Sequence, residues 1–155
     1  MIRKQRRSSR KWALALTSGA LAVAGMFSSA GTAQAATAWN ATGTQADVVG
    51  AWAHGSIWLG EDGGGQQTTN VTVTITDSQS DGASGRVYFR WRWAWGGFSG
   101  AHGPLTASGY QKSVSQTWSQ QRGTVDFYDP FEVKECRVDG GVEVECGGWD
   151  VPQHD

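Results

Sequence analysis

Few side chains in this sequence have the types and spacing that catalysis requires. His54 and Ser56 are two positions apart, so on an extended strand they would point the same way, about 6.6 Å apart. That separation is too long for the direct hydrogen bond by which a histidine activates a serine. No G-x-S-x-G or H-E-x-x-H motif occurs either. We therefore predict no catalytic residues and no cofactor.

Acidic residues in turns raise two other kinds of chemistry. Glu61 and Asp62, placed opposite Asp126 or Asp129, would supply the two carboxylates of a glycosidase. Acid-rich turns also offer oxygen ligands to calcium, but the sequence has no D-x-D-x-D loop. Solvated turn acids are the simpler interpretation, since such residues are usually exposed. We expect no metal site, and a small hydrolase is the least favoured class.

The two cysteines, Cys136 and Cys146, lie in two alternating segments, EVKECRV and VEVECGGW, that flank the turn signal DGG. Pairing the cysteines across this hairpin predicts a loop of about three residues, such as Gly140 to Val142. A disulfide then forms if the Cα atoms are within about 4.4–6.8 Å. The sequence offers neither C-x-x-C spacing nor further metal ligands nearby. We predict a structural disulfide worth about 2–3 kcal/mol.

Aromatic residues are the first candidates for binding. The chain has nine tryptophans, and extracellular sugar-binding modules present flat aromatic faces. Trp52 and Trp58 fall on the polar face of a predicted strand, with His54 on the same face. At 3.3 Å per residue the two indoles are about 20 Å apart, which suits an extended polymer better than one sugar. The alternative is that both rings are buried.

The segment RVYFRWRWAWGGF, residues 86–98, provides the second group of candidates. Alternation places its apolar side chains on one face, which we interpret as core: Val87, Phe89, Trp91, Trp93 and Trp95. The other face presents Tyr88, Arg90 and Arg92, which would bind an acidic ligand. Alternatively, these arginines pair with carboxylates of a neighbouring strand or stack on rings. The candidate ligand-binding residues are therefore Trp52, His54, Trp58, Tyr88, Arg90 and Arg92.

Strand-like alternation and glycine-rich turns determine the predicted fold. The expected strands are residues 51–59, 71–76, 86–95, 112–119 and 124–128, and the C-terminal hairpin. The longest loop is expected from Gly96 to Pro104, and only residues 36–45 look irregular. Seven or so short strands with frequent turns are typical of an all-β protein. We predict an antiparallel β-sandwich, with a small β-barrel as the alternative.

The first 35 residues have the order of a secretory signal peptide. Six basic and no acidic residues occupy positions 1–11, an apolar run follows, and Ala33-Gln34-Ala35 fits a cleavage site. The apolar run is interrupted by polar residues and is short for a retained membrane anchor. We predict cleavage near Ala35 and one secreted domain over residues 36–155. No second apolar run follows, so we expect no membrane span after cleavage.

Removing this leader changes the charge of the protein. All 14 acidic residues follow position 35 but only 7 of the 13 basic residues do, so the net charge falls from −1 to about −7. An acidic domain is repelled by phosphate backbones and by anionic membrane surfaces. Nucleic acid is therefore excluded as a partner. An extracellular carbohydrate or a secreted or cell-surface protein remains.

Three features of layout support this class: the arginine-rich leader ending in AQA, the stretch ATAWNATG at residues 36–43, and the C-x9-C hairpin followed by GGW. In this layout the chain resembles small secreted proteins of actinobacteria, a group without a characterised function. The β-rich build is also similar to bacterial carbohydrate-binding modules and small secreted protease inhibitors. We expect a non-catalytic extracellular binding module for a polysaccharide or cell-surface ligand. The alternative is a secreted partner-binding protein such as a hydrolase inhibitor or envelope protein.

Overall fold

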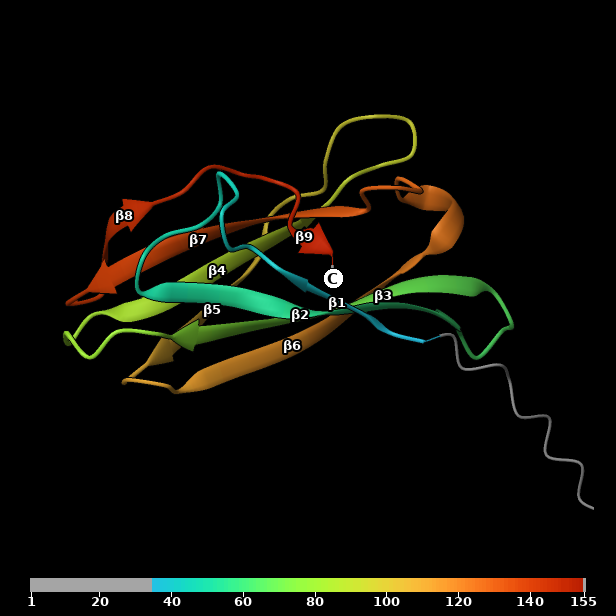
Figure 1. Cartoon of the computed structure of the whole chain (residues 1–155). Helices are drawn as coiled ribbons and strands as arrows, with labels where there is room; N and C mark the ends of the chain where they lie inside the picture. Colours follow the sequence, from blue (N-terminus) through green and yellow to red (C-terminus); the bar gives the residue numbers. More distant parts are fainter. Residues whose placement is uncertain (1–34, 155) are drawn as a thin grey trace, which may run out of the picture. The chain divides into compact units, whose positions relative to one another are not determined.

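Two antiparallel sheets pack face to face as a β-sandwich (Figure 1). The structure is a computed structural model that describes residues 35–154. Apart from Ala35, the predicted signal peptide lies outside the described residues. The predicted all-β sandwich is confirmed.

The first sheet, here called sheet A, has five strands in the order β6-β3-β2-β1-β9. Its two longest strands pair over eleven residues each, from Ala51 opposite Asp77 to Glu61 opposite Gln67. The second sheet, sheet B, has four strands in the order β5-β4-β7-β8. The strands of sheet A are β1 (Thr37–Asn40), β2 (Ala51–Glu61), β3 (Gln67–Asp77), β6 (Ser113–Gln121) and β9 (Gln153–His154). The strands of sheet B are β4 (Ser84–Trp91), β5 (His102–Ser108), β7 (Phe131–Asp139) and β8 (Val142–Cys146).

The core lies between the sheets and follows the period-two pattern of the sequence. Val71, Val73 and Ile75 of β3 are fully buried, while the threonines between them face outward. Sheet B contributes Val87, Phe89 and Trp91 of β4, which are also buried. Because successive side chains of a strand point to opposite faces, one alternating sequence serves both the core and the outer surface.

The aromatic stripe of residues 86–98 ends earlier than predicted. Strand β4 stops at Trp91, and the chain then forms a hairpin in which Arg92 pairs with Phe98. Trp93 packs against the core, but Trp95 is 71% exposed and stacks on Trp93 with ring centroids 5.7 Å apart. The core prediction for Trp95 is wrong, because two positive-φ glycines follow it and turn the chain back.

The start of the described chain is more ordered than predicted. Residues 37–40 form β1, which pairs with both β2 and β9. The indole of Trp39 is buried and meets the ring of Phe131 edge-on, with centroids 5.2 Å apart. The prediction that residues 36–45 are irregular was wrong for β1. This strand is short, so its stability comes from partners distant in sequence. The predicted long loop is shorter too, since β5 begins at His102.

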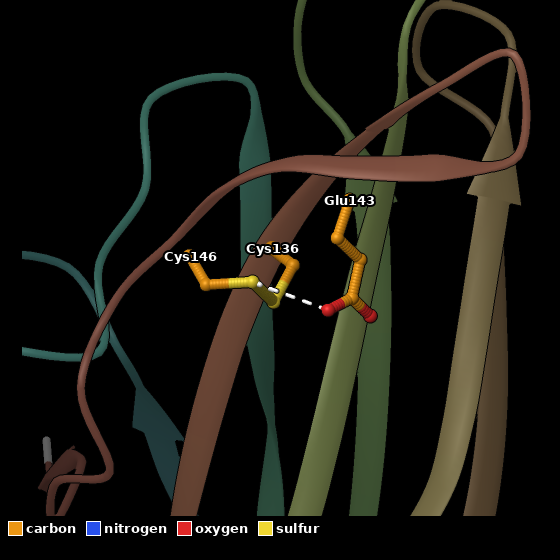
Figure 2. A group of neighbouring side chains, drawn as sticks. All are labelled: Cys136, Glu143 and Cys146. Carbon is orange, nitrogen blue, oxygen red and sulfur yellow. Dashed lines mark hydrogen bonds between the residues drawn. A yellow bond between two sulfur atoms is a disulfide. The ribbon is translucent and has the colours of Figure 1, made fainter.

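The C-terminal hairpin and its disulfide are confirmed (Figure 2). Cys136 on β7 pairs directly with Cys146 on β8, and their Cα atoms are 4.1 Å apart. The connecting loop has two residues, Gly140 and Gly141, instead of the predicted three. A register shift in the ladder accommodates the difference, because Val144 has no partner on β7.

One acidic residue lies inside the core. Glu135 points inward from β7 and is fully buried. Its Oε2 accepts the backbone N–H of Val48 at 2.8 Å, and its Oε1 accepts that of Ala53 at 2.5 Å. Burial raises the pKa of Glu135 to about 8, although these two hydrogen bonds oppose the rise. The side chain ties sheet B to the β1–β2 connection at Val48 and to strand β2 of sheet A at Ala53.

Candidate functional site

The six predicted ligand-binding residues lie on opposite outer faces of the sandwich. Trp52 and His54 lie together on the outer face of sheet A, with ring centroids 3.9 Å apart and nearly parallel planes. Trp52 is 42% exposed, and His54 Nε2 lies 3.2 Å from the Thr76 hydroxyl. Partial burial lowers the pKa of His54, which favours its neutral form. This pair therefore offers one aromatic surface and no free charge.

A ladder of hydroxyl groups lies beside this pair on the outer face of sheet A. The hydroxyls of Thr72 and Thr117 are 2.7 Å apart, as are those of Thr76 and Ser113. Such cross-strand pairs stabilise an antiparallel sheet. Because the hydroxyls bond to one another, the ladder has a sufficient structural explanation.

Trp58 is separate from the Trp52–His54 pair. Both tryptophans belong to β2, but six residues of strand place them about 20 Å apart. Trp58 is half-buried and lies at the end of the sandwich near the β2–β3 turn. The structure therefore does not bring the predicted aromatic candidates into one site.

The outer face of sheet B holds Tyr88 and Arg90 in a network of contacts. Arg90 donates from Nε and Nη2 to Glu132 Oε2, at 2.9 and 2.6 Å. Its guanidinium also lies between the rings of Phe98 and Trp149, 3.8 and 4.3 Å from their centroids. The hydroxyl of Tyr88 donates to Glu143.

Arg92 pairs with a carboxylate as well. It lies just beyond β4, and its Nη1 is 3.3 Å from Asp129 Oδ2. The arginines predicted to bind an acidic ligand thus already have acidic partners within the chain, which matches the alternative interpretation of this face. A ligand at Arg90 or Arg92 would have to displace these partners.

One cluster has the composition of a metal site (Figure 2). Ligand atoms of Cys136, Glu143 and Cys146 lie within 4.8 Å of one another, and Glu143 Oε2 is 3.4 Å from Cys146 Sγ. The two sulfur atoms, however, are bonded to each other. Because a cysteine binds metal as a thiolate, the oxidised pair offers no sulfur ligand. The cluster is a disulfide with a neighbouring carboxylate.

A cleft at one end of the sandwich brings aromatic and polar side chains together, and we call it the end cleft. It consists of two hollows of about 340 and 820 Å³ that share the residues Arg122, Asp126, Phe127 and Tyr128. The smaller hollow reaches Ile57, Trp58 and Leu59 of β2. The larger one reaches the β2–β3 turn at Gln66. Volumes of this order are typical of small-molecule sites.

The segment 122–130 forms the shared wall of the end cleft. We predicted a strand over residues 124–128, but the chain makes a 3-10 turn at Arg122–Thr124, and only Val125 bridges to Trp93. Asp126 Oδ1 then accepts the backbone N–H groups of Tyr128 and Asp129, both at 2.9 Å. This side-chain turn ends the alternation and turns two rings outward. Phe127 is 70% exposed and Tyr128 is 82% exposed.

Charged groups complete the end cleft. The Arg122 guanidinium lies 5.0 Å from the centroid of the Phe127 ring, and His154 of β9 lines the smaller hollow. The backbone hydrogen bonds of Asp126 hold the pKa of its carboxyl below the usual value, so it stays ionised at neutral pH. The cleft therefore presents rings and hydrogen-bonding groups suited to binding.

Comparisons of the chain with protein-family models, with curated proteins and with solved structures found no match. Across residues 35–154, no helix has the length and apolar character needed to cross a membrane. The class defined by the fold is the disulfide-linked antiparallel β-sandwich. Its function is inferred from the end cleft.

Proposed function

We propose that this protein is a secreted, non-catalytic binding module that holds a polysaccharide in its end cleft. The observation that supports the proposal most strongly is the exposure of Phe127 and Tyr128 beside two adjoining hollows. The two rings are neighbours and form one exposed aromatic patch, and covering such a patch on binding releases water. Fixed rings are also effective contact surfaces, since they lose little conformational entropy on binding.

The polar groups around these rings favour a sugar over a purely apolar ligand. A sugar ring has an apolar C–H face, which stacks on an aromatic ring, and a rim of hydroxyls that need hydrogen bonds. Trp58 and Tyr128 supply rings, while Arg122 and Gln67 supply donors and acceptors. The two hollows meet at shared residues, so successive units of one chain could occupy both.

Affinity electrophoresis in gels containing plant or microbial polysaccharides tests the proposal. The wild-type protein should be retarded on at least one gel. Tyr128→Ala and Trp58→Ala should each weaken that interaction by about fivefold to tenfold, from the stacking energy of one aromatic contact. Retention of full affinity by both variants, or no retardation of the wild type on any gel, would refute binding in the end cleft.

Two matched aromatic variants show whether removing any exposed ring weakens polysaccharide binding. Tyr110→Ala removes a ring that is 54% exposed in the β5–β6 turn, near Asp77 at the opposite end of β3 from the cleft. Trp52→Ala tests the outer face of sheet A, because Trp52 lines neither hollow of the end cleft. Both variants should bind as the wild type does. A loss confined to Trp52→Ala would transfer the site to that face.

A secreted protein partner is the second candidate. The same exposed rings would anchor a protein, because interface hot spots are rich in tyrosine. In that case tagged protein would capture a partner from culture supernatant, and Tyr128→Ala would abolish the capture. Secretion itself is tested by the amino-terminal sequence of protein recovered from the medium, which should begin at Ala36.

A further inference from the structure

The arginines of this protein differ in whether they have an acidic partner. Four of the arginines in residues 35–154 form ion pairs with carboxylates: Arg86, Arg90, Arg92 and Arg137. Arg122 is the only arginine of the described chain that forms none. It is also the arginine that lines both hollows of the end cleft. The one arginine without an acidic partner among residues 35–154 therefore lies in the candidate site.

The backbone of Arg122 lies in a short turn, and its guanidinium lies near one aromatic ring. Arg122 begins the 3-10 turn, which Thr124 closes by donating from its hydroxyl to the Gln121 carbonyl at 2.7 Å. The stacked ring of Phe127 supports the guanidinium from one side. The planar guanidinium of an arginine presents parallel N–H donors, which match the two oxygens of a carboxylate.

The acidic residue that lines both hollows, Asp126, forms no ion pair with Arg122. Its Oδ1 is already occupied by the backbone N–H groups of Tyr128 and Asp129. Asp126 thus fixes the turn, and the donors of Arg122 remain available to a ligand.

The charge of the whole domain limits what kind of anion can bind. Residues 36–155 carry 14 acidic and 7 basic residues, so a dense polyanion would be repelled over most of the surface. A single carboxylate that contacts Arg122 avoids most of that repulsion, since screening is strong beyond about 8–10 Å at physiological ionic strength. The surface therefore favours a ligand with widely spaced negative charges.

We infer that the end cleft binds a largely neutral glycan bearing isolated uronic acid residues, and that Arg122 binds the uronate carboxylate. This inference rests on the proposed glycan-binding function and names its ligand class. Trp58, Phe127 and Tyr128 stack on the neutral units of the chain, and Arg122 distinguishes the acidic unit. Arg122 is therefore the residue that determines specificity.

Pairs of polysaccharides that differ only in their carboxyl groups test this inference. Glucuronoxylan and gum arabic are each used in native form and after chemical reduction of the uronic acids to neutral sugars. Binding of the purified protein is measured by affinity electrophoresis and by calorimetry. At least one native polysaccharide should bind about tenfold or more tightly than its reduced form, as expected for a charge-assisted hydrogen-bonded pair. The preference should weaken as salt is raised.

Variants at position 122 assign the preference to the guanidinium. Arg122→Gln should bind native and reduced forms equally, at the affinity of the wild type for the reduced form. Arg122→Lys keeps the charge but not the planar donors, so it should retain only part of the preference. Because Arg122 is only half-buried, both variants should melt close to the wild-type temperature.

Three results would overturn the inference, and they separate it from the proposed function. Equal binding of native and reduced forms by the wild type, unchanged in Arg122→Gln, would refute the uronate while leaving glycan binding intact. Stronger binding to polygalacturonate than to glucuronoxylan would refute the requirement for isolated charges. Absence of binding to every neutral and acidic polysaccharide would refute the proposed function itself.

Discussion

Replacing Glu135 with glutamine should change how the stability of the sandwich depends on pH. The pKa of this carboxyl is about 8 in the folded protein, against an ordinary value of 4.5. Between those values the folded state keeps a proton that the unfolded state releases. The free energy of unfolding of the wild type therefore falls as pH rises, by up to about 1.4 kcal/mol per pH unit.

The magnitude of this effect follows from the depth of burial. Across the window from pH 4.5 to 8 the group should cost the wild type on the order of 3–5 kcal/mol. Glu135→Gln cannot ionise, so it should lack this slope. Glutamine keeps one oxygen acceptor and leaves the N–H of Val48 or Ala53 unsatisfied, which costs about 1–2 kcal/mol at every pH. The variant should be less stable than the wild type near pH 5 and more stable at pH 8.

Guanidinium unfolding followed by tryptophan fluorescence, repeated from pH 4.5 to 8.5, measures this difference. Other titrating groups do not affect the difference between the two proteins. The lowered pKa of His54 changes the stability of both proteins equally. Three acids with lowered pKa values affect stability mainly below pH 4.5: Asp81, Asp126 and Glu143. Glu145→Gln, at an exposed position on β8, is the control and should parallel the wild type. Parallel curves for Glu135→Gln and wild type would refute the reasoning, because they would mean that Glu135 is ionised in the fold.

Three further changes test other contacts of the sandwich. Gly55→Ala would place a Cβ 1.9 Å from the backbone oxygen of Thr72, so it should lose about 3 kcal/mol or more of stability. Gly63→Ala, with nothing within 4 Å, should lose almost none, and equal melting temperatures for the two variants would contradict the β2–β3 register. Arg90→Met should cost about 1–3 kcal/mol, part of which Glu132→Gln restores in a double-mutant cycle; strict additivity would show that the pair is uncoupled. Changing both Cys136 and Cys146 to alanine should cost about 2–3 kcal/mol in guanidinium unfolding, and unchanged stability would show that the bridge adds nothing.

The sequence predicted those elements whose local pattern agrees with their tertiary environment. The alternation of Val71, Val73 and Ile75 gave both the strand and its buried face, because one side of sheet A is packed and the other is not. The glycines between Cys136 and Cys146 predicted the hairpin and the disulfide. Its loop length differed because a bulge at Val144 changes the register, and a bulge leaves no clear signal in composition.

The candidate site was predicted less completely, for an identifiable reason. Trp58 was a candidate from its predicted strand face, whereas Phe127 and Tyr128 fell within the predicted strand 124–128 and were not among the candidates. The Asp126-x-x-Asp129-Pro130 sequence is typical of a turn that an aspartate side chain closes. A turn at this place predicts that the rings of Phe127 and Tyr128 are exposed. Arg122 could not have been identified in this way. That it forms no ion pair among residues 35–154 depends on where carboxylates distant in sequence lie.

The pairing of β1 with β9 has a practical consequence for anything attached to this domain. Strand β9 lies beside β1 (Figure 1), and Thr37 of β1 and His154 of β9 both line the smaller hollow of the end cleft. A tag, linker or neighbouring domain joined at either position would therefore emerge at the mouth of the site and compete with its ligand. The Gly140–Gly141 turn, with open space around both glycines, lies away from the lining of both hollows. It is the better place for a label or an immobilisation handle.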